Sequence, residues 1–293
     1  MLKMIRKISY RIYISLNNLK LVLPNLLILM RASILIISES FKRPKYQLFK
    51  IHSLPDQIKS QPYEGSSPIR LYMDIAVKTL FEQFCTDKNA NILEVGCGRG
   101  AYSQELIKIP VSGKYTGIDL NHNPEWNLFR GKKKNLHIEF APISIKEINE
   151  LGNTFNFSFS LATLHYLEND VDDLKSILAS MDKNSFSIHC IPSLWSHFLY
   201  IRQGVRRYSA KSATNTFTKA GFEVVDVKKL CGVFSFLLHI TWITLLESNL
   251  KLNFMRKNPQ LLRIYSWMLT ICLKLDKWSP WMEAGYIVIA KTP

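Results

Sequence analysis

The sequence predicts an α/β domain with a mostly parallel sheet, and three observations carry that prediction. Branched apolar residues at 92–95 run into glycines at every second position, namely Gly96, Gly98 and Gly100. A helix-compatible stretch follows over residues 101–108. A second strand-like run then occupies residues 115–119 and ends in Asp119. A buried strand, a tight turn, a helix and a further strand are the parts from which a parallel sheet is built.

The turn after the first strand has the composition of a ligand site. Glycine adopts backbone angles that a Cβ forbids, and a backbone without side chains lets a ligand come close. The first N–H groups of the following helix have no partner inside that helix, so they are available to a bound group. We therefore expect a nucleotide-like ligand at residues 96–100.

Two carboxylates indicate which nucleotide this is. The pattern Gly96-x-Gly98-x-x-Ala101 also fits a dinucleotide fingerprint, so the glycines alone do not decide. Glu94, two positions before Gly96, would repel a pyrophosphate but attract an ammonium group. Asp119 ends the second strand and can accept two hydrogen bonds from a ribose diol. An ammonium, a ribose and no phosphate together describe S-adenosylmethionine.

The pattern Glu94-x-Gly96-x-Gly98-x-Gly100, followed by Asp119, resembles the cofactor site of class I S-adenosylmethionine-dependent methyltransferases, of the type 11-like group. Four later segments are similar to the family's remaining strands and their ends, and cover residues 155–167, 185–191, 220–227 and 286–290. The resemblance spans about residues 65–232 plus the last strand. It implies a three-layer, Rossmann-like fold whose mostly parallel seven-stranded sheet has an antiparallel last strand, with S-adenosyl-L-methionine as cofactor.

The resemblance also implies a set of cofactor-binding residues. They are Glu94, Gly96, Cys97, Gly98, Gly100, Asp119 and the backbone of Leu161. One departure concerns adenine, because family members usually place an acid just after the third strand, here 136–140. Residues 141–144 carry no carboxylate. Glu139, inside that strand, is a possible substitute, and backbone groups alone are the alternative.

A candidate catalytic base follows the fourth strand at His165. Methyl transfer to a hydroxyl acceptor benefits from a group that takes the proton, and histidine is suited to that task near neutral pH. The competing interpretation is that His165 only packs beside the cofactor. No metal site is expected, because Cys85, Cys97, Cys190, Cys231 and Cys272 are scattered without metal-ligand spacing. Their pattern favours a reducing cytoplasm.

The basic charge lies at the two ends of the chain. Residues 1–50 carry ten basic residues against one acid, a net charge of +9. Residues 51–194 carry fourteen against seventeen, a net charge of −3, and residues 195–293 carry fourteen against five, again +9. We therefore divide the chain into a basic, apolar segment at 1–60 and a methyltransferase domain at 61–293 with a helical insertion about 231–283.

Both basic regions are also apolar, which suggests contact with an anionic membrane surface. The run 21–38 is close to the length of a membrane span, about 20 residues. Arg31 near its middle would cost about 2.5–3.5 kcal/mol in a bilayer. We expect an interfacial helix there, with a membrane anchor as the alternative. The second region places Trp267, Trp278 and Trp281 beside cations; ordinary core helices are the alternative.

These observations predict methyl transfer from S-adenosylmethionine to a small or amphipathic acceptor, such as a lipid, quinone or glycan intermediate. The enzyme is expected to be cytoplasmic, peripheral on the membrane or anchored to it. A non-catalytic cofactor-binding membrane adaptor is the second hypothesis, and Glu94 makes a nicotinamide oxidoreductase unfavourable. A nucleic-acid substrate is disfavoured, because Ser160-Leu161-Ala162-Thr163 replaces the Asn/Asp-Pro-Pro-aromatic loop of base-amine methyltransferases. The oligomeric state is left open.

Overall fold

The computed structural model describes residues 46–51, 67–85, 89–199, 206–249, 258–279 and 281–293. The basic N-terminal segment expected at 1–60, with its apolar run at 21–38, lies outside these residues except for 46–51.

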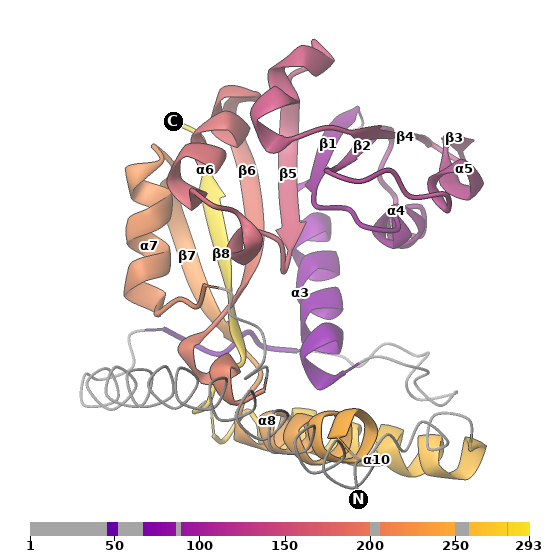
Figure 1. Ribbon diagram of the computed structural model, residues 1–293, viewed down its shortest axis with the longest axis vertical. Coiled ribbons are helices and arrows are strands. Elements are labelled where there is room, and N and C mark those ends of the chain that lie inside the picture. Colours follow the sequence, from indigo (N-terminus) through magenta and orange to yellow (C-terminus); the bar gives the residue numbers. More distant parts are fainter. Residues whose placement is uncertain (1–45, 52–66, 86–88, 200–205, 250–257, 280) are drawn as a thin grey trace, which may run out of the picture.

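A single eight-stranded sheet forms the centre of the molecule, in the order β3-β4-β2-β1-β5-β6-β8-β7 (Figure 1). β1 pairs in parallel with β2 and β5, while β8 runs antiparallel to both β6 and β7. The predicted fold class, including the antiparallel last strand, is confirmed. The strands are β1 Ala90–Val95, β2 Gly113–Asp119, β3 Gly131–Lys133, β4 Leu136–Pro142, β5 Phe155–Leu161, β6 Met181–Pro192, β7 Glu223–Leu230 and β8 Gly285–Lys291.

The structure adds one strand to the seven expected. Lys132, Lys133 and Lys134 are predicted to lie in a loop, but Gly131–Lys133 forms β3, antiparallel to β4. Lys134 makes the turn between them, with a positive φ of 51°. The short strand has no apolar residue, so its sequence carries no strand signal, and its backbone pairing with β4 alone defines it.

Helices cover both faces of the sheet. One face packs against α3 and α4, and the other packs against α6 and α7. The helical elements are α3 Pro68–Phe84, α4 Ala101–Leu106, α5 Trp126–Phe129, η1 Ile145–Leu151, η2 Leu164–Tyr166, α6 Asp170–Ala179, η3 Leu194–Phe198, α7 Ala210–Lys219, α8 Val233–Leu238, the π-helical η4 His239–Asn249 and α10 Pro259–Leu275.

Helix α3 starts at a well-formed cap. The Ser67 hydroxyl accepts a hydrogen bond from the N–H of Arg70, and Pro68 occupies the first helical position, where a missing N–H costs nothing. The buried side of α3, which includes Leu71, Tyr72 and Leu80, packs on the sheet. The helix therefore holds its remaining residues at fixed places beside the strand ends.

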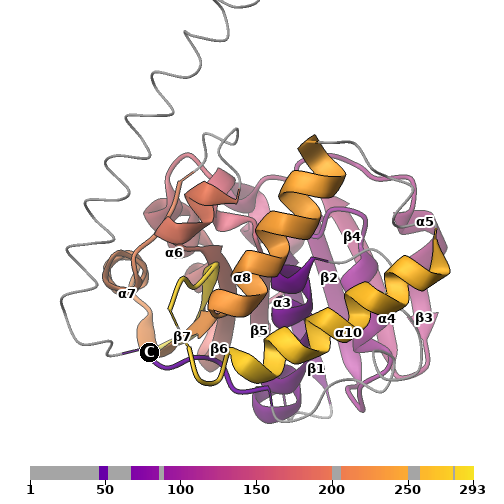
Figure 2. The ribbon, with the colours of Figure 1, turned by 90° about the horizontal axis from the view of Figure 1, so that it is seen from below.

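Helices α8 and α10 lie across the edge of the sheet where β6 and β7 end (Figures 1 and 2). Gly285, the first residue of β8, pairs with Pro192 and Leu230 at that edge. The two helices contact each other, and α8 contacts α3. None of the helices that the structure describes is both long and apolar enough to cross a bilayer.

Candidate cofactor and active site

The glycine turn joins the end of β1 to α4, and its three glycines have φ angles of 73°, 53° and 79°. A Cβ on Gly96 would lie 2.3 Å from Thr163 Oγ1, and one on Gly100 would lie 2.5 Å from the Phe140 ring. A Cβ on Gly98 would meet nothing within 4 Å. Packing thus explains two of the glycines, while the third leaves open space where a ligand can approach.

The N–H groups of this turn are mostly used inside the protein. Gly96 and Cys97 both donate to the Ile118 carbonyl, and Gly98 donates to Asp119 Oδ2 at 2.9 Å. Helix α4 is only six residues long. These three N–H groups precede the helix, so the prediction that the first N–H groups of the helix are available to a ligand stays a prediction.

Glu94 is buried, and its environment favours the neutral form. Burial raises its pKa to about 8, although the hydrogen bond from Tyr115 and the charge of Arg70 act in the opposite direction. The Tyr115 hydroxyl donates to Glu94 Oε2 from the adjacent strand. Burial and Glu94 together raise the pKa of Tyr115, so that hydroxyl remains a donor. A cation placed beside Glu94 would restore its ionised form.

Helix α3 supplies positive charge close to this carboxyl. Arg70 Nε lies 2.9 Å from Asp74 Oδ1, one helical turn along. The Arg70 guanidinium also lies 5.1 Å from the centre of the Tyr102 ring, and the Tyr102 hydroxyl donates to Asp74. The half-exposed Arg70 therefore lies near Glu94, although it comes from α3, which precedes the glycine turn in the chain.

Asp119 lies at the end of β2 with both oxygens oriented by backbone groups. Oδ2 accepts from Gly98, and Oδ1 accepts from the N–H of Asn121 at 3.3 Å. An ionised carboxylate has about four acceptor positions, so it can still bind a diol. Trp126 fixes the turn from the other side, since its Nε1 donates to the Gly98 carbonyl at 2.8 Å.

The structure brings the two carboxylates and the glycine turn together at one edge of the sheet. Cys97, within the turn, is buried, and burial together with Glu94 raises the pKa of its thiol. Leu161 ends the neighbouring β5 and is followed by Ala162 with a φ of 55°, a rare angle for a residue with a Cβ. Ala162 donates to the Cys190 carbonyl, and Thr163 then packs on Gly96.

Glu139 is engaged elsewhere. Its carboxylate lies 2.7 Å from Lys114 Nζ and 3.0 Å from His137 Nε2, on the partly exposed surface of β4. The hydrogen bond from Lys114 lowers the pKa of Glu139. These contacts occupy the Glu139 carboxylate at the surface of β4, so its role as a substitute adenine acid stays a prediction.

His165 lies in η2 and is only 6% exposed. Burial and the nearby charge of Arg207 lower its pKa to about 4, so the imidazole is neutral at pH 7. Its Nδ1 atom is buried and makes no hydrogen bond to any described residue. The side chain is therefore a neutral acceptor or donor, and a weak base.

Sequence reasoning missed four residues of this site, namely Arg70, Tyr102, Tyr115 and Trp126. The Arg70–Asp74 spacing is readable as one helical turn, but their neighbours come from other elements.

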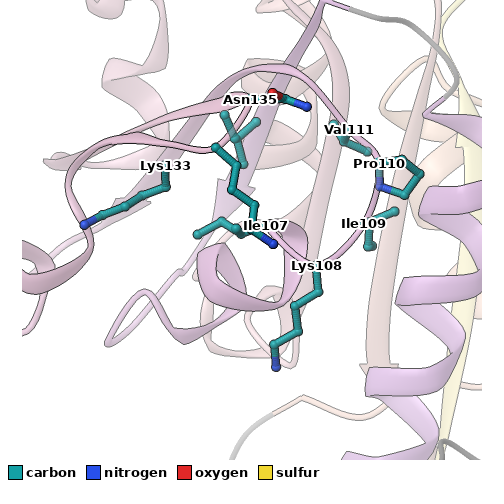
Figure 3. Close-up of a pocket in the computed structure, with 9 residues that line it drawn as sticks. Ile107, Lys108, Ile109, Pro110, Val111, Lys133 and Asn135 are labelled. Atoms are coloured by element: carbon teal, nitrogen blue, oxygen red, sulfur yellow. The ribbon is translucent and has the colours of Figure 1, made fainter.

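A separate hollow of about 280 Å³ lies at the opposite edge of the sheet, where β2 and β4 begin (Figure 3). Its Lys108 and Lys133 side chains extend away from each other, and Lys108 pairs with Glu105 at 2.6 Å.

The fold is that of an α/β protein whose glycine turn and two carboxylates lie at the ends of its first two strands. Residues 69–227 match the family model of a methyltransferase domain, which is more than half of the chain. The chain belongs to this family and is an S-adenosylmethionine-dependent methyltransferase of class I, with S-adenosylmethionine as its cofactor. No curated protein matches the chain at the level of sequence.

Solved structures share the fold at low identity. The cyclase SpnF is 15% identical with a TM-score of 0.52, covering 75% of this chain and 80% of its own. A methyltransferase from Haloferax volcanii, in complex with its activator Trm112, is 13% identical with a TM-score of 0.50, covering 74% and 88%. The cyclopropane synthase MmaA2 from Mycobacterium tuberculosis is 13% identical with a TM-score of 0.50, covering 74% and 82%. These similarities establish the fold alone.

Proposed function

We propose that the enzyme transfers the methyl group of S-adenosylmethionine to a small or amphipathic acceptor, such as a lipid, quinone or glycan intermediate, at the cytoplasmic surface of a membrane. The observation that carries the membrane part is the outer face of α10. Ile264, Trp267 and Leu275 on this helix are 49%, 66% and 38% exposed, and Trp278 just after it is 86% exposed. Large aromatic side chains are rarely left in water without a partner surface.

The charges on this face favour an anionic surface. Arg263, Lys274 and Lys277 are exposed among the apolar residues. Within the described stretch 258–279 the single acid, Asp276, is fully buried. Tryptophan suits the headgroup layer, and each cation near anionic lipid contributes about 1 kcal/mol. A helix with this composition fits a position in the membrane interface.

The residues at the strand ends are proposed to divide the cofactor between them. S-adenosylmethionine, when bound, supplies a methyl group on a positively charged sulfur. Glu94 would pair with the ammonium of the methionine end, and Arg70 is placed to attract its carboxylate. Asp119 would accept hydrogen bonds from the ribose hydroxyls, while the open face at Gly98 and the backbone of Leu161 would line the path between them.

His165 is proposed to receive the acceptor's proton. The proton of a hydroxyl or amine acceptor would pass to His165 when that acceptor takes up the methyl group that bound S-adenosylmethionine would supply. The lowered pKa of His165 supports a modest role as a base, because a base of pKa about 4 takes a proton only as the acceptor becomes more acidic during the transfer. Orientation of the acceptor carries the larger share of the rate.

The membrane part is tested with the full chain and sedimented vesicles of phosphatidylcholine, with and without phosphatidylglycerol. Binding is expected only when phosphatidylglycerol is present. The double variant Trp267→Ala, Trp278→Ala should bind at least about tenfold more weakly, because each indole contributes a large apolar area. Leu128→Ala with Val225→Ala, also exposed apolar residues, is the control. Unchanged binding by the tryptophan variant would refute this docking face.

The acceptor class is tested by incubating the protein with methyl-labelled S-adenosylmethionine and a membrane extract. Label should enter the organic phase with wild type and not with Asp119→Ala. Label recovered with nucleic acid would replace the proposed acceptor. No transfer despite cofactor binding would favour the membrane adaptor.

A further inference from the structure

A cavity of about 230 Å³ lies beside the proposed cofactor site, where β5 and β6 end. Its walls include Ile69 and Met73 from α3, Ala162 and His165 from the segment after β5, Cys190 from β6, and Arg207. Pockets that enclose a whole drug-sized ligand measure about 300–1,000 Å³. The cavity therefore fits a headgroup or a single ring, with the rest of a larger molecule outside.

The cavity shares two walls with the cofactor site. Ala162 follows Leu161 directly, and the next residue, Thr163, is the one that packs on Gly96. On α3, Ile69 and Met73 line the cavity, while Arg70 between them reaches Asp74 and the Tyr102 ring. A molecule in the cavity would thus lie next to a cofactor held at the glycine turn.

The polar groups of the cavity are few and of one sign. Among the described residues that line it, Arg207 is the charged one and none is acidic. Arg207 Nη1 donates to the Arg206 carbonyl at 3.1 Å, which holds the guanidinium in place. His165 and Tyr166 are the neutral polar side chains of the lining, and the buried Nδ1 of His165 bonds to no described residue. The remaining walls are largely apolar.

The positive charge of Arg207 affects the pKa of two nearby histidines. It contributes, after burial, to the lowered pKa of both His165 and His197. Guanidinium binds carboxylate and phosphate in a two-point geometry, and these bonds are among the strongest that side chains form.

We propose that this cavity is the acceptor site, and that it selects acceptors carrying an oxyanion, a carboxylate or phosphate ester, which binds Arg207 while the apolar walls hold the adjoining ring or chain. This assignment rests on the proposed methyltransferase function and narrows its acceptor class. An oxyanion on Arg207 also offsets the charge that acts on His165, so the acceptor itself would make that imidazole a better proton acceptor.

The test uses the full chain saturated with S-adenosylhomocysteine, titrated with benzoate, phenyl phosphate and the uncharged benzamide. Calorimetry should detect binding of the two oxyanions and at least about tenfold weaker binding of benzamide, since a charge-assisted contact is worth about 1.5–3 kcal/mol. Arg207→Gln should weaken oxyanion binding by at least about tenfold, and Arg207→Lys should restore part of it. Arg206→Gln is the matched control, because Arg206 pairs with Asp170 at 3.1 Å outside the cavity.

A second variant guards against misfolding of Arg207→Gln. Met73→Phe keeps the arginine but fills the cavity, so it should abolish binding of both oxyanions. Retained S-adenosylhomocysteine binding in each variant reports an intact cofactor site. No oxyanion binding to wild type, or equal binding by wild type and Arg207→Gln, would overturn this assignment while leaving the methyltransferase proposal in place. Loss of S-adenosylhomocysteine binding by wild type would instead count against the cofactor site.

A competition experiment distinguishes two sources of the oxyanion, a lipid headgroup and a free small molecule. Vesicles of phosphatidylcholine that contain phosphatidic acid should displace phenyl phosphate if the natural anion is a lipid headgroup. Vesicles of phosphatidylcholine alone are the control. Displacement supports the oxyanion site with a lipid source, and its absence, with phenyl phosphate still bound, supports it with a free small molecule.

Discussion

Two opposing effects act on Glu94, because burial favours its neutral form while the proposed pairing with the cofactor ammonium needs its charge. Its folded-state pKa of about 8 lies above the ordinary value of 4.5. The folded protein therefore holds a proton that the unfolded chain releases between these values. That difference stabilises the fold below pH 4.5 and is lost as pH rises through 8.

Glu94→Gln should consequently raise stability while it weakens the site. Glutamine keeps an acceptor for Tyr115 and has no charge to bury, so we expect about 2–4 kcal/mol higher unfolding free energy at pH 8.5 and little difference at pH 4.5. Urea unfolding at both pH values measures this, and Glu82→Gln on the exposed side of α3 is the control. S-adenosylmethionine affinity should fall in the same variant. A destabilised Glu94→Gln at pH 8.5 would contradict the neutral buried carboxyl.

His165 gives the opposite linkage, because its pKa is lowered from 6.5 to about 4. The unfolded chain then binds a proton that the folded protein does not, so stability falls as pH drops from 6.5 to 4. The slope is about 1.4 kcal/mol per pH unit for each such group. His189 and His239, with pKa values lowered by burial to about 3 and about 4, add to the same acid sensitivity.

His165→Asn should make the unfolding free energy less dependent on pH, by the contribution of the one proton that His165 takes up on unfolding. Unfolding free energies at pH 6.5, 5.5 and 4.5 measure it, with exposed His122→Asn as the control. An unchanged slope would show that His165 is not held neutral by the fold. For turnover, wild type should show no inflection from His165 between pH 6 and 7, since the imidazole is already neutral there.

Among the elements, three helices are joined by one carboxylate. Asp276 caps the end of α10 and is fully buried. Its Oδ1 accepts from the N–H groups of Phe234 and Ser235 at the start of α8, at 2.9 and 3.2 Å. Its Oδ2 accepts from the Tyr72 hydroxyl of α3 at 3.0 Å. Because α3 also carries Arg70, Met73 and Ile69, this contact links the outer helices to the cofactor and acceptor sites.

Asp276→Ala should lower the unfolding free energy by about 3 kcal/mol, since it leaves three donors without their acceptor. Tyr72→Phe removes only one hydrogen bond and should cost about 1 kcal/mol. Urea unfolding measures both, with Asp182→Ala at an exposed position as the control. If Asp276→Ala costs no more than Tyr72→Phe, the helix-joining role assigned to Asp276 is wrong.

The sequence predicts elements well where a local pattern defines them. Phe157 and Phe159 in β5 lie on one face, as simple alternation predicts, and the glycine turn follows β1 as expected. Strand β3 was missed because its lysines carry no apolar pattern. The partners of Glu94 were missed for a different reason, since Tyr115 and Arg70 come from separate elements and meet only after folding.

For the whole molecule, the arrangement of charge and apolar surface unites the proposals. The α8–α10 layer lies across the same edge of the sheet at which the cofactor residues and the cavity are found (Figure 2). Composition predicts the basic, apolar character of 231–283, but only the fold places it beside the strand ends. A membrane-bound acceptor would therefore meet the enzyme on the side where its oxyanion cavity lies.

Calorimetric titration of S-adenosylmethionine into wild type and Asp119→Ala, with NADH as the competing cofactor, is the sharpest test of the cofactor site. We expect micromolar binding of S-adenosylmethionine to wild type, none of NADH, and a loss of at least about tenfold in Asp119→Ala, because two hydrogen bonds to a carboxylate disappear. Equal affinity in wild type and Asp119→Ala would contradict the placement of the ribose at the end of β2. Binding of NADH in place of S-adenosylmethionine would contradict the cofactor assignment as a whole.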